Sequence, residues 1–199
     1  DNVAELTEEA CRIAKEMGLT VSCDLNFRKK LWSSEKAGRV MGKLMEYVDI
    51  VIANEEDAEL VFGIKAPKTD VTAGELNMEG YKYVSKELVD RFHLKMAAIT
   101  LRESLSASDN NWSAMIYDGN QYYFSRKYHL HIVDRVGGGD SFGAGLIYSL
   151  MTGKDTRYAL EFAVAASALK HTIEGDANHV SIEEVETLMG GDASGRVQR

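Results

Sequence analysis

Three consecutive glycines precede an aspartate where an apolar, helix-like segment begins, in the run DRVGGGDSFGAG at residues 134–145. The first amides of a helix lack an intrahelical partner and carry about half a positive elementary charge, so a glycine turn that leads into a helix can bind phosphate. Gly137, Gly138 and Gly139 supply such a turn. Asp140 places a carboxylate beside this anion site, where it would repel the anion unless it has a chemical role. Taking a proton from an attacking hydroxyl is such a role. The alternative is an aspartate that only caps the helix.

The familiar nucleotide-binding patterns do not match this run. Counted from Gly137, the dinucleotide pattern G-x-G-x-x-G would need a glycine where Phe142 stands. The phosphate-binding loop that ends in Gly-Lys is also absent, because Ala144 follows Gly143. The run therefore predicts neither a Rossmann nor a Walker nucleotide site.

The longer segment DRVGGGDSFGAGLIYSL, residues 134–150, resembles the C-terminal signature of the ribokinase-like, or pfkB, carbohydrate kinases. The resemblance implies that Asp140 is the catalytic base. It also implies that the backbone amides of Gly137, Gly138 and Gly139 form the anion hole for the transferring phosphate. ATP would be the phosphoryl donor, with Mg²⁺ as its counter-ion.

A second segment, DLNFRKKLW at residues 24–32, combines acidic, amide and basic side chains. It follows a strand-like run, at the edge where ligands bind in open α/β sheets, and alternation points Asp24, Asn26 and Arg28 the same way. Arg28 either clamps a carboxylate or phosphate, or pairs with the surface charges beside it. The segment resembles the 2-keto-3-deoxygluconate kinases of the family, which implies that Arg28 contacts the carboxylate of a sugar acid. The same resemblance places Arg28 and Asn26 near the ATP phosphates.

A third segment, NEEDAELVFG at residues 54–63, resembles a helix of the family that helps to hold magnesium and phosphate, often through water. The family's glutamate is replaced by Asp57, so the role falls to Asp57 or to its neighbour Glu56. Without the resemblance, Asn54 as an N-cap with acidic residues in the first turn explains the stretch.

The remaining resemblances concern the nucleotide and the sugar. The segment TLRESLSASDNNWSA, residues 100–114, takes the place of the ATP-contacting strand end, which implies ATP contacts from Thr100, Arg102 and Ser104. The segment FAVAASALKHT matches the helix that walls the adenine, with Val164 on it, and Asp176 resembles a residue that touches the substrate. On their own, the helix indicates core packing and Asp176 indicates a turn.

Helices and strands alternate along most of the chain, which predicts the α/β class with an open, mostly parallel sheet and helices on both faces. Two strand-like runs around Asp118, Gly119 and Asn120 predict an antiparallel hairpin at one edge. We expect one domain at residues 1–190, an incomplete version of the ribokinase-like fold, followed by a disordered tail at 191–199. The expected helices are 3–17, 33–46, 54–62, 79–92, 140–152, 155–171 and 181–189, and the expected strands are 19–25, 48–53, 96–101 and the hairpin 112–126, with a loop at 64–78.

One of these helices has an apolar set that we expect to face inward. The set in helix 140–152 is Phe142, Leu146, Ile147, Leu150 and Met151.

Composition narrows the class of protein. The chain has 23 Lys and Arg against 31 Asp and Glu, and its net charge of -8 disfavours nucleic acid or an anionic membrane as the main partner. No apolar run approaches the roughly 20 residues of a membrane span, so we expect a cytoplasmic protein. Cys11 and Cys23 are expected to be reduced thiols. His129 and His131 alternate on a strand-like stretch without a third ligand nearby, and we expect no zinc site there.

These expectations describe ATP-dependent phosphorylation of a small sugar acid, 2-keto-3-deoxygluconate, to its 6-phosphate. Two alternatives stay open: a fructokinase or ribokinase that acts on a neutral sugar, and a nucleotide-binding fragment that performs no chemistry. Family members carry a preceding region with further strands, a Gly-Gly substrate motif and a small β lid that often mediates dimerisation, which is not recognisable in residues 1–199. We therefore expect weak or no turnover from residues 1–199 alone. We expect a homo-oligomer only through the lid region of the family.

Overall fold

A computed structural model describes residues 2–66 and 78–191 of the chain. Most of the expected loop at 64–78 lies outside the described residues, and so does the expected disordered tail except for its first residue. In the described part of the chain, no helix is long and apolar enough to cross a bilayer.

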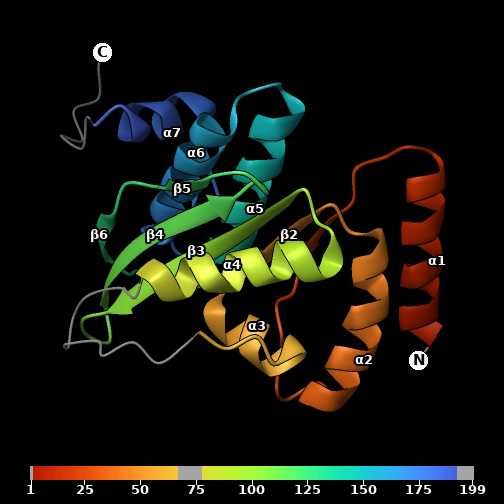
Figure 1. The fold of residues 1–199 in the computed structure, drawn as a ribbon. Helices are drawn as coiled ribbons and strands as arrows, with labels where there is room; N and C mark the ends of the chain where they lie inside the picture. The colour runs from red at the N-terminus through yellow and green to blue at the C-terminus, as the bar shows by residue number, and fades with distance from the viewer. Residues whose placement is uncertain (1, 67–77, 192–199) are drawn as a thin grey trace. The chain divides into compact units, whose positions relative to one another are not determined.

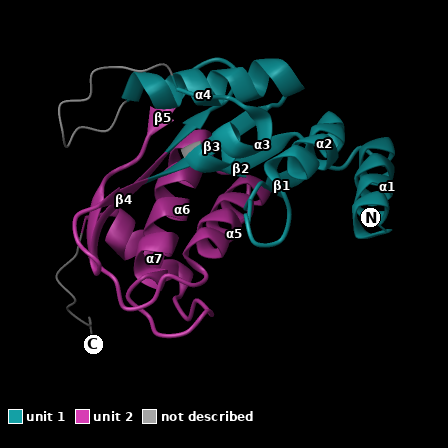
Figure 2. Cartoon of the chain, turned by 90° about the horizontal axis from the view of Figure 1, so that it is seen from below, with its two compact units in different colours: residues 1–101, 115–122 teal, residues 102–114, 123–199 magenta. Residues whose placement is uncertain are grey.

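The chain forms two compact units, which Figure 2 colours separately. Unit 1 consists of residues 1–101 and 115–122, and unit 2 consists of residues 102–114 and 123–199. The chain passes from one unit to the other inside strands β3, β4 and β5. The expected single domain at residues 1–190 stays a prediction.

Unit 1 is built from alternating helices and strands, drawn from red to yellow-green in Figure 1. Strands β1 and β2 pair in parallel, with Ser22 opposite Ile50, and β2 pairs in parallel with β3, with Ile50 opposite Met96. This arrangement confirms the expected α/β class with parallel strands. The elements are α1 (Asn2–Glu16), β1 (Ser22–Asp24), α2 (Ser34–Leu44), the 3₁₀ helix η1 (Met45–Tyr47), β2 (Ile50–Ala53), α3 (Glu55–Phe62), α4 (Met78–Phe92) and the first part of β3 (Met96–Ser104).

Short polar residues and a glycine set the ends of the helices in unit 1. The hydroxyl of Ser33 accepts a hydrogen bond from the amide of Lys36 and caps α2. The side chain of Asn54 caps α3 in the same way, and Gly63 ends α3 in the left-handed conformation, with φ of +69°. Residues of these types are local signals that favour helix ends.

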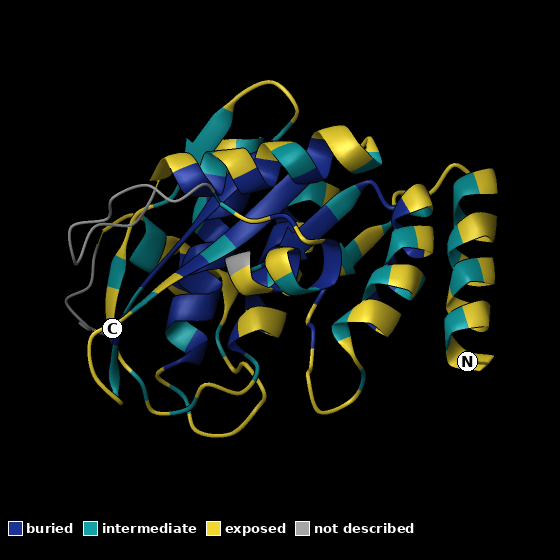
Figure 3. Cartoon of the chain, turned by 60° about the horizontal axis from the view of Figure 1, so that its bottom comes forward, coloured by how far each residue is buried: buried dark blue, intermediate teal, exposed yellow. Residues whose placement is uncertain are grey.

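Helix α1 forms within one residue of the expected range 3–17, yet none of its residues is buried. Val3 is 77% exposed and Leu6 is 66% exposed, and Figure 3 shows α1 without any buried segment. The strands of unit 1 differ, because Val51, Ala97 and Ile99 in β2 and β3 are completely buried.

Unit 2 contains strand ends followed by three helices. Strand β4 pairs antiparallel with β6, with Asp109 opposite His131. Along the whole sheet the strand order is β1-β2-β3-β4-β5, and β6 lies on β4 outside that path. The elements are the last part of β3, the first part of β4 (Asp109–Tyr117), most of β5 (Tyr122–Phe124), β6 (Tyr128–His131), α5 (Gly138–Met151), α6 (Thr156–Lys170) and α7 (Ile182–Met189).

The predicted hairpin between β4 and β5 is confirmed. The amide of Asp118 donates to the carbonyl of Gln121 at 3.3 Å, and Gly119 supplies the positive φ of +85° that the tight turn requires. The rings of Tyr117 and Tyr122 stack across the turn.

Helices α5 and α6 pack closely because α5 presents small residues to α6. A Cβ on Gly145 would lie 3.0 Å from the Cα of Ala163, so the two backbones approach each other at this glycine. Phe142 and Leu146 are completely buried, as expected. The expectation was wrong for Ile147 and Met151, which are 38% and 82% exposed. The buried face of α5 runs through Ser141, Gly145 and Ser149 instead.

Candidate active site

The glycine turn in front of α5 has a shape that only glycine allows. Gly137 is the N-cap of α5, with a left-handed φ of +81°. A Cβ on Gly137 would overlap the carbonyl oxygen of Asp176, and a Cβ on Gly138 would overlap the ring of His171. The glycines are therefore required by close backbone packing as well as by the turn itself.

The turn leaves some of its amides available to a ligand. The amide of Ser141 donates to Gly137 at 2.9 Å, and the amide of Gly138 donates to Arg135 at 3.3 Å. Among the described residues, the amides of Gly137, Gly139 and Asp140 have no hydrogen-bond acceptor. Gly138 is buried and its amide is engaged, so the amides of its neighbours are the better donors for an anion.

The carboxylate of Asp140 is free in this arrangement. Asp140 is the third residue of α5 and is exposed, and α5 has no side-chain cap. The interpretation of Asp140 as a capping residue is therefore wrong. Across residues 2–66 and 78–191, no side chain or backbone group forms a hydrogen bond or ion pair with this carboxylate. Such a group can accept a proton from a hydroxyl placed beside it.

The carboxylate of Asp134 forms hydrogen bonds with two backbone amides near the glycine turn. It accepts the amide of Val136 at 2.9 Å and the amide of Gly175 at 3.1 Å. The hydrogen bond from Val136 is the main cause that lowers the pKa of Asp134, and the amide of Gly175 and the charge of Lys170 lower it further. Asp134 thus ties the segment before α5 to the segment after α6.

The other predicted residues of unit 2 take different positions. Asp176 is exposed, and its backbone lies against Gly137, so the structure brings this predicted substrate contact to the glycine turn. Arg102 and Ser104 are exposed at the end of β3. Val164 is completely buried in α6. Its side chain therefore cannot touch a ligand unless the residues packed around it move. Thr100, in the part of β3 that belongs to unit 1, is half-buried.

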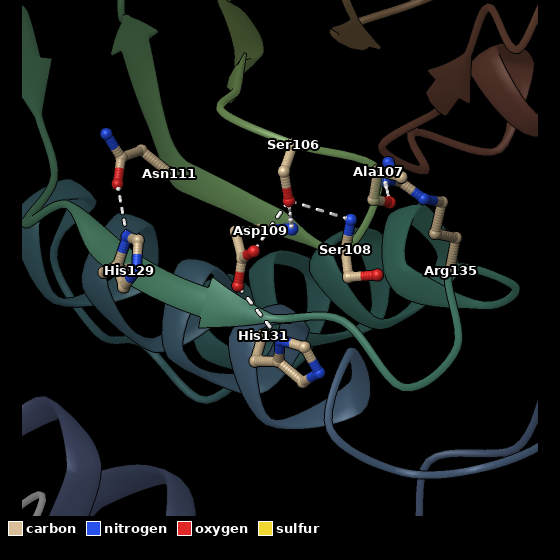
Figure 4. A network of polar contacts seen from close by, with 8 residues as sticks. All are labelled: Ser106, Ala107, Ser108, Asp109, Asn111, His129, His131 and Arg135. Atoms are coloured by element: carbon tan, nitrogen blue, oxygen red, sulfur yellow. Dashed lines mark hydrogen bonds and ion pairs between the residues drawn. The ribbon is translucent and has the colours of Figure 1, made fainter.

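A polar network joins the β3–β4 loop to the segment before the glycine turn (Figure 4). The guanidinium of Arg135 donates to the carbonyl of Ala107 at 2.7 Å. His131 lies 2.9 Å from the carboxylate of Asp109, which also accepts the hydroxyl of Ser106 at 2.6 Å. Sequence reasoning missed Arg135, although it stands inside the quoted glycine run.

The two histidines of β6 are exposed and each is paired with a side chain of β4. His131 faces Asp109, and His129 lies 3.1 Å from the amide oxygen of Asn111. Within the described ranges, no group of three or more His, Cys, Asp or Glu side chains could hold a metal ion.

Unit 1 holds the second group of predicted site residues around a cavity of about 360 Å³. Arg28 lines the cavity, and the expected alternation before it is confirmed: Leu25 and Phe27 are buried while Asn26 and Arg28 are exposed. Asn26 has a positive φ of +39°, a conformation that asparagine tolerates better than most residues. The lining residues are Phe27, Arg28, Lys29, Lys30, Asn54, Glu56, Asp57 and Leu60.

The two acidic residues of this cavity have different environments. Asp57 is buried and accepts the amide of Phe27 at 3.3 Å, and burial raises its pKa. Glu56 is exposed and forms an ion pair with Lys29 at 2.7 Å. Mg²⁺ is usually held by one or two carboxylates together with substrate phosphates and water. Glu56 and Asp57 fit that kind of site and do not fit a cage made by the protein alone.

Residues 2–183 match the sequence profile of the pfkB family carbohydrate kinases. This match covers most of the chain. The chain belongs to the pfkB family.

Individual pfkB relatives are similar over nearly all of the chain. A 2-dehydro-3-deoxygalactonokinase from Haloferax volcanii is 30% identical over 195 residues, which cover 97% of this chain and 54% of the relative. A 2-dehydro-3-deoxygluconokinase from Thermoproteus tenax is 27% identical over 83% of this chain and 45% of the relative. The crystal structure of a 2-dehydro-3-deoxygluconokinase from Thermotoga maritima superposes with a TM-score of 0.87 at 48% identity, over 96% of this chain and 56% of that one. The chain thus spans about half the length of the relatives it matches.

Membership of the pfkB family confirms the expected fold class and the family resemblance of the glycine run. Sequence reasoning missed Lys30 as a residue of the cavity in unit 1, and it considered Lys29 only as a member of a surface ion pair. Their signal was present in the run RKK, which places three cations in the segment that follows the strand.

Proposed function

We propose that this chain carries the phosphoryl-transfer machinery of an ATP-dependent kinase for a sugar acid, with 2-keto-3-deoxygluconate as substrate and its 6-phosphate as product. The observation that carries the proposal is the pairing of a free Asp140 carboxylate with unpaired amides at the same helix start. Membership of a carbohydrate kinase family and the names of the similar sugar-acid kinases support it.

The proposed reaction forms one bond and breaks one. The oxygen of the sugar hydroxyl attacks the terminal phosphorus of ATP, Asp140 takes the proton of that hydroxyl, and the bond between the phosphorus and ADP breaks. The amides of Gly139 and Asp140, together with the dipole of α5, stabilise the charge on the transferring phosphoryl group. Glu56 and Asp57 are the residues that would hold Mg²⁺, which would supply further positive charge to the phosphates when bound.

In this proposal, the basic residues of unit 1 determine whether the substrate is an acidic or a neutral sugar. Arg28, Lys29 and Lys30 line the cavity and place positive charge there, although Lys29 is already paired with Glu56. An exposed guanidinium can form two parallel hydrogen bonds with a carboxylate, which a neutral sugar lacks. This chemistry favours a sugar acid over fructose or ribose.

The decisive experiment is the Asp140→Asn variant of the native protein, assayed for kinase activity and for ATP binding. The amide keeps the size of the side chain and removes the base, so kcat should fall about 10²–10⁴-fold while ATP affinity changes little. Glu183→Gln, at an exposed position in the first turn of α7, is the matched control and should retain full activity. Near-normal turnover in Asp140→Asn would refute the proposed role of Asp140.

A further inference from the structure

A lysine without any exposed surface lies beside the glycine turn. Lys170 is the last residue of α6 and is 0% exposed. Its Cε lies 3.3 Å from the position that a Cβ on Gly137 would take, and its ammonium donates to the carbonyl of Ile173 at 3.2 Å. An ammonium group taken out of water loses its hydration, which one neutral acceptor does not replace. Burial of this charge next to the turn therefore calls for a reason beyond packing.

The carboxylate of Asp134 lies close enough to Lys170 for the two charges to interact. It accepts hydrogen bonds from the amides of Val136 and Gly175, which join the segment before α5 to the segment after α6. The charge of Lys170 favours the ionised form of Asp134 and lowers its pKa. An uncompensated carboxylate at this place would repel an anion bound at the turn, and Lys170 offsets that repulsion.

Lys170 differs from the other cations close to this region by its burial. Arg102 and Arg135 are exposed, so water and salt screen their charges. The ammonium of Lys170 is shielded from solvent. A charge acts more strongly on its surroundings in the protein interior than in water. Its partner Ile173 and its neighbour Gly137 belong to the two segments that shape the turn.

We propose that Lys170 is a positioning residue whose buried positive charge keeps the glycine turn in the form that binds the phosphates of ATP. The inference rests on the proposed function, because it assigns Lys170 to the same phosphate site. Lys170 acts through Gly137 and Asp134 and does not touch the substrate. A lysine with a purely structural role would stabilise the fold without favouring charged ligands over neutral ones.

The test compares the binding of ATP and adenosine to the native protein by isothermal titration calorimetry. Lys170→Met keeps an unbranched side chain that is one atom shorter and removes the charge, and Lys170→Gln keeps a donor without the charge. We expect each variant to lose about tenfold or more in ATP affinity. Adenosine affinity should change less than about twofold, because adenosine carries no phosphate. Lys154→Met, at an exposed lysine between α5 and α6, is the control and should leave both affinities unchanged.

Each outcome decides between a positioning role of Lys170 at the phosphate site and a purely structural role. Folded variants with an unchanged ratio of ATP to adenosine affinity, or with equal losses for both ligands, would overturn the inference. Failure of both variants to fold would overturn it as well, since the charge would then serve folding. If the unchanged protein binds ATP no better than adenosine, the proposed kinase function itself fails.

Discussion

The carbonyl oxygen of Asp176 occupies the space that a Cβ on Gly137 would need. Residue 137 also has a φ of +81°, which is unfavourable by about 1–2 kcal/mol for a residue with a side chain. The loop after α6 and the turn before α5 therefore fit together only while residue 137 is glycine.

Gly137→Ala should lower the free energy of unfolding by about 2–4 kcal/mol, because backbone strain and a clash with Asp176 add to each other. Gly139→Ala is the matched control, since nothing lies within 4 Å of its Cβ position, and its stability should change by less than about 1 kcal/mol. Urea denaturation of both variants measures the difference. Equal stability of the two variants would show that the contact between Gly137 and Asp176 is not rigid.

Local signals predicted the elements of this fold because helix ends and strands depend on neighbouring residues. Ser33 and Asn54 cap the helices that follow them, and Gly63 ends α3, as their residue types indicate. The glycine turn was predictable for the same reason. Its spacing alone indicates a turn that leads into a helix.

Features that depend on residues far apart in the chain were not predictable. Lys170 follows a run of small residues at the end of a helix, where a lysine usually reaches solvent. Its burial depends on Gly137 and on the segment around Ile173, which no local pattern reveals. Likewise, the periodicity of α1 predicts an apolar face on Val3 and Leu6, but it does not say what covers that face.

Cys23 should be a slowly reacting thiol. Burial raises its pKa to about 12, and the nearby charges of Asp24 and Cys11 add to the effect. At pH 8 the thiolate would be about a thousandfold less populated than in a thiol with the ordinary pKa of 9.0. Alkylation of the Cys11→Ser variant by iodoacetamide, followed by mass spectrometry, should therefore be far slower in the native state than in urea. Equal rates in both states would contradict the burial of this thiol.

His171 should make the protein less stable in acid. Its ring is buried beside Gly138, and burial favours the neutral form. Its Nδ1 lies 2.7 Å from the carbonyl of Ser167, and this hydrogen bond opposes the effect of burial only in part. Burial lowers the pKa of His171 below its usual value of 6.5, and the charges of Lys170, Arg135 and Arg102 lower it further. The unfolded chain therefore binds a proton more readily, so the stabilisation is present above about pH 6.5 and is lost as the pH falls through the lower folded value.

Urea denaturation between pH 5 and pH 8 measures this effect of His171. The unfolding midpoint of the unchanged protein should fall with decreasing pH, and His171→Gln, which cannot titrate, should show a shallower dependence. His93→Gln, at an exposed histidine of unit 1, is the control for the loss of any histidine. The prediction fails if His171→Gln keeps the full pH dependence.

Arg28 should decide between acidic and neutral sugars if it binds a carboxylate. Arg28→Leu removes the guanidinium and leaves a shorter apolar side chain, so kcat/KM for 2-keto-3-deoxygluconate should fall about 100-fold through the loss of a charge-assisted contact. Residual activity toward fructose or ribose should stay within about threefold, because those sugars carry no carboxylate. Arg39→Leu, at an exposed arginine of α2, serves as the control. A substrate panel on the native protein checks both expectations, and an equal loss for acidic and neutral sugars would mean that Arg28 serves the ATP phosphates instead of the sugar.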